Sequence, residues 1–120
     1  MSLIDTPDMD YLERFLDVAA FRQTLVAANL ANLDTPGYQT RDVSFQSEMM
    51  RASLDDYQEP MRPFVRPVMG LIERPDGNNV SLDRESLLLA QTQMQYKIAI
   101  QLMKSVFHTM HGAINDGAES

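Results

Sequence analysis

Apolar residues recur through the first third of the chain at alternating spacings of four and three. The series begins at Leu12 and ends at Leu33, and Gln23 is its one polar member. This is the seam pattern of a coiled coil about three heptads long, and it predicts a helix over residues 8–34. An isolated helix of this length is marginal in water, so the stripe requires a partner. The apolar seam positions expected to take part in helix–helix assembly are Leu12, Leu16, Ala19, Val26, Leu30 and Leu33.

The segment after this stripe carries a strong stop signal. Pro36 has no amide hydrogen and pushes Thr35 out of the α region, so the helix should end near residue 34. Thr35 to Tyr38 fit a type II turn, with proline at the second position and Gly37 at the third, where a positive φ is needed.

Two asparagines precede this turn. Asn29 and Asn32 are three residues apart and share one face of the helix. Their side chains could bond carbonyl groups of the last turn or a neighbouring chain. Taken alone, they indicate only that a helix ends here.

Residues 35–80 lose the helical period, and four of the six prolines lie in the second half of this segment, at Pro60, Pro63, Pro67 and Pro75. Residues 45–54 are expected to form a short helical turn. Residues 64–66 and 68–72 could form short strands, which the prolines would confine to a sheet edge. A segment of this length without a strong core pattern predicts an irregular middle that is mobile in the free chain.

A second long helix is predicted over residues 81–114. Ser81 is a suitable N-cap, and Asp83 and Glu85 place negative charge in the first turn, where the helix dipole favours it. Gly112 and Gly117 are expected to close the helix. A parallel row that includes Tyr96 and Phe107 makes its apolar face too broad for a single partner helix. The main apolar row, expected to serve helix–helix assembly, contains Leu87, Met94, Ile98, Leu102, Val106 and Met110.

The two helices also differ in charge. Between Ser86 and Ile114 the only charged residues are Lys97 and Lys104. The first predicted helix instead carries four carboxylates and two arginines, so its net charge is negative. Opposite signs favour pairing, although an exposed pair is worth only about 0.5 kcal/mol. The predicted fold is therefore mainly α: one domain over residues 1–120, in which two terminal helices pair as an antiparallel coiled-coil hairpin around an irregular, short-β middle.

Composition narrows the classes of function. The formal net charge of −7 argues against nucleic acid and anionic membranes as partners. No apolar run approaches the roughly 20 residues that span a bilayer, which predicts no insertion into lipid. Asp5, Asp8 and Asp10 stand where a signal peptide carries basic residues and an apolar core, so no cleaved signal peptide is expected.

Groups that carry catalysis are sparse. The chain has no cysteine and two histidines, and it lacks a Gly-x-Ser-x-Gly elbow and a phosphate-binding loop. His108 and His111 have the i, i+3 spacing of a metal-chelating pair, but the nearest carboxylates in sequence lie beyond the predicted helix. We therefore predict no enzyme, no cofactor and no metal site. The remaining feature is apolar helix surface beyond what one chain of 120 residues can bury, which indicates self-association or docking onto other helices.

Both ends of the chain resemble the bacterial flagellar rod and hook proteins. Residues 25–45 are similar to the N-terminal signature of that family, in which Thr-Pro-Gly-Tyr is followed by a basic–acidic pair, here Arg41 and Asp42. Residues 76–96 resemble its C-terminal signature. Leu30 and Ser81 depart mildly from the commoner isoleucine and aspartate. The matching motif positions are Asn29, Asn32, Thr35, Pro36, Gly37, Tyr38, Asn78, Asn79 and Val80.

The resemblance implies a structural subunit of the proximal rod in the flagellar basal body. Such proteins leave the cytoplasm through the flagellar type III apparatus without a cleaved signal and polymerise through their terminal helices. The implied partners are other proximal rod subunits, the adaptor between MS ring and rod, the export gate and further copies. Phe45 and Met49 resemble the aromatic-x-x-x-hydrophobic signal shown to the export gate, although two anchors of one helical turn would give the same pattern.

Two other functions fit the residues alone. A soluble helical regulatory or chaperone-like module would bind one partner through a helix-in-groove contact and would be a folded monomer. A metal enzyme that uses His108 and His111 would retain about one metal equivalent after purification.

Overall fold

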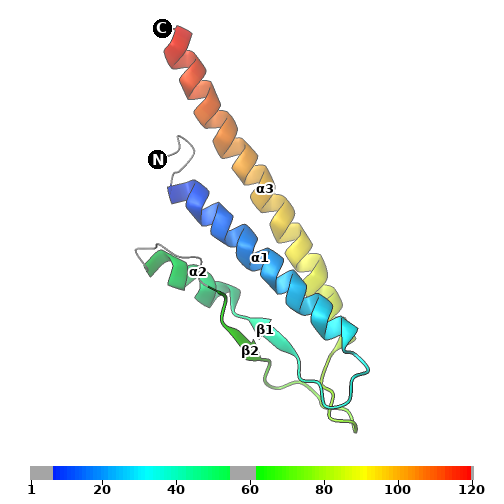
Figure 1. The fold of residues 1–120 in the computed structure, drawn as a ribbon. Coiled ribbons are helices and arrows are strands. Elements are labelled where there is room, and N and C mark those ends of the chain that lie inside the picture. The colour runs from blue at the N-terminus through cyan, green and yellow to red at the C-terminus, as the bar shows by residue number, and fades with distance from the viewer. Residues whose placement is uncertain (1–6, 55–61, 120) are drawn as a thin grey trace.

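The described residues form three helices and a two-stranded sheet (Figure 1). The structure, a computed structural model, describes residues 7–54 and 62–119. The elements in order are α1 (Pro7–Ala31), β1 (Arg41–Val43), α2 (Phe45–Leu54), β2 (Val65–Pro67) and α3 (Leu82–Glu119). The terminal helices α1 and α3 lie against each other and run in opposite directions (Figure 1). The predicted mainly helical fold with paired terminal helices is confirmed.

α1 ends at Ala31, three residues before the predicted boundary. The reason is that the hydrogen bonds after Ala31 change to the tighter i to i−3 pattern. The Asn32 amide donates to the carbonyls of both Ala28 and Asn29, and the Leu33 amide donates three residues back, to Leu30. The predicted turn follows, since the Tyr38 amide donates to the Thr35 carbonyl and Gly37 has a φ of 75°.

The middle segment contains more regular structure than predicted. β1 and β2 pair antiparallel, with Val43 opposite Val65, and α2 coincides with the expected helical turn. β1 was not predicted, and residues 68–72 do not form the expected strand. The Val68 amide still donates to the Thr40 carbonyl, but the next available carbonyl along that segment, that of Tyr38, accepts from the Asn79 amide instead, so the strand pairing does not continue. Residues 55–61, which include Pro60, lie outside the described residues.

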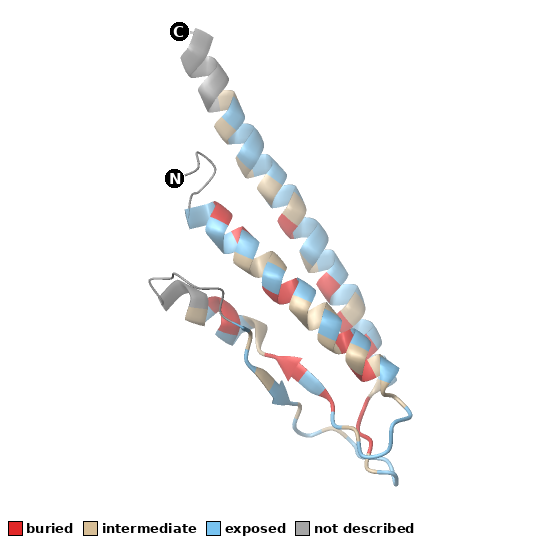
Figure 2. Cartoon of the chain, viewed as in Figure 1, coloured by how far each residue is buried: buried red, intermediate tan, exposed pale blue. Residues whose placement is uncertain are grey.

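α1 is buried on two faces and lies between α3 and the layer formed by β1, β2 and α2 (Figure 2). On its seam, Leu12, Ala19 and Val26 are buried, as expected for helix pairing. A neighbouring face carries Val18, which packs with Val43 and Met49. The partly buried side chains that surround this core are Phe15, Phe21, Leu25, Phe45 and Val65.

α3 starts as predicted and ends later than predicted. The Arg84 amide donates to the Ser81 hydroxyl, so Ser81 is the N-cap. The helix continues to Glu119, because Gly112 lies inside it without a left-handed φ. A glycine inside a helix costs only about 1 kcal/mol relative to alanine, which does not stop it. With 38 residues against 25 in α1, α3 extends past the N-terminus of α1 (Figure 1).

The face of α3 that packs on α1 differs from the predicted apolar row. The buried positions include Glu85, Leu88, Thr92 and Ala99. Val106 and Met110 are half-buried, whereas the other four members of the predicted row are exposed. The fractional exposures of those four are 69% for Leu87, 64% for Met94, 49% for Ile98 and 50% for Leu102. The face of α3 that packs on α1 of the same chain contains the polar residues Glu85 and Thr92, and a search for apolar residues at helical spacing does not find them.

None of the helices in the described part of the chain is long and apolar enough to cross a membrane.

Candidate functional site

The residues that follow α1 and those that precede α3 meet in a hydrogen-bonded cluster, here called the helix junction (residues 29–41 and 74–80). Asn78 lies at its centre and is fully buried. Its Nδ2 donates to the carbonyls of Asn32, at 2.9 Å, and Thr35, at 2.8 Å. Its Oδ1 accepts from the Val80 amide at 2.8 Å. One side chain thus fastens the end of α1 to the approach to α3.

Asn29 performs a similar function toward β1. Its Oδ1 accepts from the Arg41 amide at 3.2 Å and from the Tyr38 hydroxyl at 3.0 Å. Its Nδ2 donates to the Arg41 carbonyl at 2.9 Å. The side-chain amide therefore pairs with both backbone groups of Arg41, as a neighbouring strand would, and satisfies that edge of β1. Asn32 instead donates to the Ala28 carbonyl, as predicted for a last-turn bond.

Two glycine turns lie against each other in the junction. The Gly37 amide donates to the Asp76 carbonyl at 2.9 Å, and Gly77 has a φ of 85°. A Cβ on Gly77 would stand 3.3 Å from the Gly37 Cα, tighter than most Cβ contacts. Asn79 adds a bond across the two segments, because its Oδ1 accepts from the Thr40 amide at 2.7 Å. The family motif residues of both signatures therefore form one contact region.

Arg74 belongs to the junction and was not singled out from the sequence. Its guanidinium donates to the Val80 carbonyl at 2.8 Å, to Asn78 Oδ1 at 2.6 Å and to the Leu33 carbonyl. It places positive charge at the C-terminal end of α1, whose own last turn has no basic residue. The contacts span up to 41 residues of sequence, so no local pattern could have identified them.

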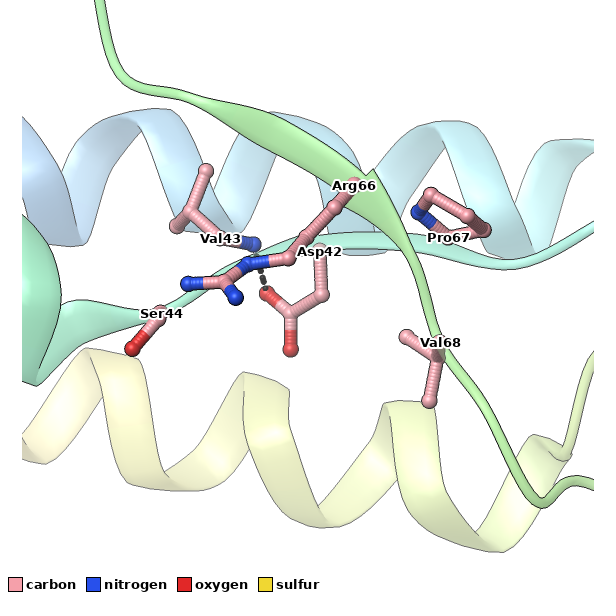
Figure 3. Close-up of a pocket in the computed structure, with 6 residues that line it drawn as sticks. All are labelled: Asp42, Val43, Ser44, Arg66, Pro67 and Val68. Carbon is pink, nitrogen blue, oxygen red and sulfur yellow. Dashed lines mark hydrogen bonds between the residues drawn. The ribbon is translucent and has the colours of Figure 1, made fainter.

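A second polar cluster joins α1, β1 and α3. Arg22 binds Asp42 through two bonds, Nε to Oδ1 at 3.0 Å and Nη2 to Oδ2 at 2.9 Å. Arg84 donates to Asp42 Oδ2 at 2.7 Å and to Glu85 Oε1 at 2.7 Å. Asp42 lines a shallow pocket of about 180 Å³. The pocket lies where β1 and β2 pass over the paired helices (Figure 3). The remaining lining residues are Val43, Ser44, Arg66, Pro67 and Val68.

The electrostatics of this cluster favour the charged form of Asp42. Burial acts to raise its pKa, but it is outweighed by the hydrogen bonds and charge of Arg22, by the Val43 amide and by Arg84. The pKa of Asp42 is therefore lowered below its ordinary value.

This lowered pKa predicts a pH-dependent contribution to stability. An unfolded aspartate titrates near about 3.9, so the contribution is complete above that value and is lost as pH falls through the lower folded pKa. Replacing Asp42 with asparagine presents amide hydrogens to two guanidinium groups. We expect Asp42→Asn to lower the free energy of unfolding by about 2 kcal/mol at pH 7. The difference between variant and wild type, measured by urea unfolding, should shrink steadily below pH 4. An equal difference at pH 7 and pH 3 would disprove the ionic origin.

Glu48 also joins separate elements through a buried carboxylate, here the middle segment and α1. Its Oε2 lies 2.6 Å from Arg51 Nη2 and 3.3 Å from Arg14 Nη2. Its Oε1 accepts from the Phe64 amide at 2.7 Å. The carboxylate therefore joins α1, α2 and the chain that leads into β2.

The two residues of the predicted export signal pack inward. The Phe45 ring meets the Phe15 ring edge to face, with centroids 4.7 Å apart. Met49 is buried in the core beside Val18. In the folded chain Met49 is buried and Phe45 is half-buried.

The two histidines of the metal hypothesis lie on the exposed side of α3, and the His111 ring stacks on Phe107 at 6.4 Å. Within residues 7–54 and 62–119, no group of three or more His, Cys, Asp or Glu side chains could hold a metal ion.

Two antiparallel helices locked at one end, with an apolar row exposed along α3, define a helical structural protein that presents surfaces to other chains. The sequence profile described as flagella basal body rod protein matches residues 18–39. Three flagellar basal body rod proteins FlgB are similar over most of their length. The protein of Borrelia hermsii is 31% identical and that of Bacillus subtilis 30%, covering 86% and 88% of this chain and 92% of each relative. The protein of Salmonella typhimurium is 29% identical, over 89% of this chain and 92% of its own length.

The chain belongs to the FlgB family of flagellar basal body rod proteins. It is a structural component of the rod, as the resemblance implied, and the family is not enzymatic. The three relatives are described as rod proteins, and none as a regulatory module or a metal enzyme.

Proposed function

We propose that this chain is a subunit of the proximal rod and that it polymerises through the helix faces it leaves exposed when alone. The observation that carries this proposal is the row Leu87, Met94, Ile98 and Leu102, whose members are between 49% and 69% exposed along one helix. Single exposed apolar residues are ordinary, but a contiguous apolar row on a soluble chain is typical of an interaction surface.

The helix junction supports the same proposal. Its bonds hold the end of α1 to the approach to α3 through Asn78 and Arg74, and Asn29 holds α1 to the start of β1. A fixed hairpin presents its outer faces with little entropy left to lose on assembly, which favours binding. The motif residues of the junction then act by positioning the helices, and the apolar row makes the contact.

The proposed partners are other proximal rod subunits, further copies of this chain and the adaptor between MS ring and rod. The type III export route is part of the same proposal. Phe45 and Met49 are packed against Phe15 and Val18, so an export gate could read them only before α2 folds onto α1.

Export and assembly can be tested in one experiment on an epitope-marked chain, followed in the cytoplasm and in purified basal bodies. We expect Phe45→Ala to leave most of the chain in the cytoplasm, because the gate signal is lost. Phe15→Ala is the matched control, since it removes the ring that packs on Phe45 and weakens the same core. Equal export of the two variants would exclude Phe45 as a signal. Absence of the wild-type chain from purified basal bodies would overturn the proposed function.

A further inference from the structure

We infer that the exposed apolar row of α3 packs in the rod against the outer face of α1 of a second copy of this chain. The inference rests on the proposed assembly function and names its partner. It concerns two surfaces of the chain that are both uncovered and that match in size, spacing and charge.

The α3 surface consists of large apolar side chains. Leu87, Met94 and Ile98 follow spacings of seven and four, with the exposed Gln91 between the first two. At about 100° per residue, this row lies about a third of a turn from the face buried against α1. It therefore remains available after the chain has folded.

The outer face of α1 consists of small side chains. Ala20, Thr24, Ala27 and Ala31 are all exposed and follow spacings of four, three and four. The Thr24 hydroxyl donates to the Ala20 carbonyl at 3.1 Å, so its polar group is satisfied and its methyl group is left to pack. Small side chains let a second helix approach closely enough for large ones to fill the intervening space.

The two rows have the same spacing when the helices run antiparallel, as α1 and α3 do within one chain. Setting Ala31 opposite Leu87 brings Ala27 opposite Gln91, Thr24 opposite Met94 and Ala20 opposite Ile98. Each contact then joins a small residue to a larger one, with no carboxylate placed against the apolar row.

Charge supports the same register. Continuing the alignment sets Lys104 level with Arg14, whose charge is paired with Glu48, and within about one turn of Glu13 and Asp17. Lys97 lies within about one turn of Asp17. The two lysines, Glu13 and Asp17 are exposed, and none of these four takes part in an ion pair found in the described part of the chain. Lys97 and Lys104 are the only charges between Ser86 and Ile114. A basic helix surface beside an acidic one favours this partner over a like-charged helix.

The contact repeats from copy to copy. The surface used on α3 differs from the surface it meets on α1, so each copy retains one free surface of each kind. Such a heterologous contact forms a ring or an open helical array and does not end at a dimer.

Disulfide trapping tests this register directly, because the chain has no cysteine of its own. Cells would produce two forms, one with Thr24→Cys and the other with Met94→Cys, and their purified basal bodies would be oxidised. Each form has one cysteine, so any disulfide between them joins two chains. We expect a covalent dimer that needs both forms, and much less product from Thr24→Cys with Leu102→Cys, which is about two turns out of register. Ala20→Cys with Ile98→Cys provides a second in-register pair if the first is not incorporated.

Exchanging the charges of Lys104 and Glu13 tests whether these two side chains lie close together across the proposed contact. Lys104→Glu in the Met94→Cys form should reduce the dimer yield, and Glu13→Lys in the Thr24→Cys form should restore it. No dimer from in-register pairs that are incorporated into rods, or a covalent product with a different rod protein, would overturn the inference and leave the assembly function standing. Absence of even the wild-type chain from the basal bodies would overturn the function as well.

Discussion

Replacing Ile98 with aspartate is expected to abolish rod assembly without unfolding the chain. Ile98 is 49% exposed in the single chain, so the carboxylate can remain hydrated there. When the α3 row is covered in the rod, the same carboxylate becomes an unpaired buried charge, which costs several kcal/mol. Cells should be non-motile and their basal bodies should lack rods, while the free energy of unfolding should change by less than about 1 kcal/mol.

Two variants control for this result. Gln93→Asp introduces the same charge on an exposed side of α3 away from the row and should leave swimming normal. Leu30→Asp places the charge on the half-buried seam of α1 and should destabilise the isolated chain itself. Normal swimming with Ile98→Asp, or its unfolding in isolation, would contradict the assigned role of the row.

The largest loss of stability is expected from Asn78→Ala. The substitution removes the donors to the Asn32 and Thr35 carbonyls and the acceptor for the Val80 amide, in a site that is fully buried. Each buried group left without a partner costs about 1–3 kcal/mol, so we expect a loss of about 3 kcal/mol or more in the free energy of unfolding. Urea unfolding followed by circular dichroism measures it.

A matched variant tests the cause of that loss. Asn78→Asp keeps the acceptor for Val80 and Arg74 but sets a carboxylate oxygen against the Asn32 and Thr35 carbonyls, so its unfolding midpoint should also fall well below that of wild type. Gln101→Ala, on the exposed surface of α3, should change stability by less than about 0.5 kcal/mol. Equal stability of Asn78→Ala and wild type would show that the junction does not hold the two helices together.

The parts of the fold that local chemistry decides could be predicted from the sequence. Heptad spacing predicted α1 and α3, the Ser81 hydroxyl predicted the N-cap, and Pro36 with Gly37 predicted the turn. Gly112 was misjudged because a glycine ends a helix only where the chain turns left-handed there.

The packed face of α3 could not be predicted, because two apolar rows compete for α1. The row that stays exposed is the more hydrophobic of the two, and the row that packs on α1 includes the polar residues Glu85 and Thr92. Burial of Thr92 depends on its bond to the Leu88 carbonyl at 2.8 Å, and that of Glu85 on Arg84. Such compensation is visible only once the side chains are placed.

The candidate site was predicted in part. The motif asparagines were identified by resemblance, and their convergence follows from the packing of two segments about 45 residues apart. The roles of Arg74 and of the Asp42 cluster were missed, because the contacts that define them include partners 20 to 42 residues away in sequence. The assembly roles of the apolar row and of Phe45 and Met49 stay predictions.

The most direct test of the central claim, that the exposed row of α3 is covered in the rod, is the labelling rate of a single cysteine at position 94. A maleimide would be applied to Met94→Cys as purified chain and in purified basal bodies, with Gln93→Cys as the reference on the neighbouring exposed surface. We predict fast labelling of both positions in the free chain and strong protection of position 94 alone in the rod. Equally fast labelling of position 94 in both states would contradict the account.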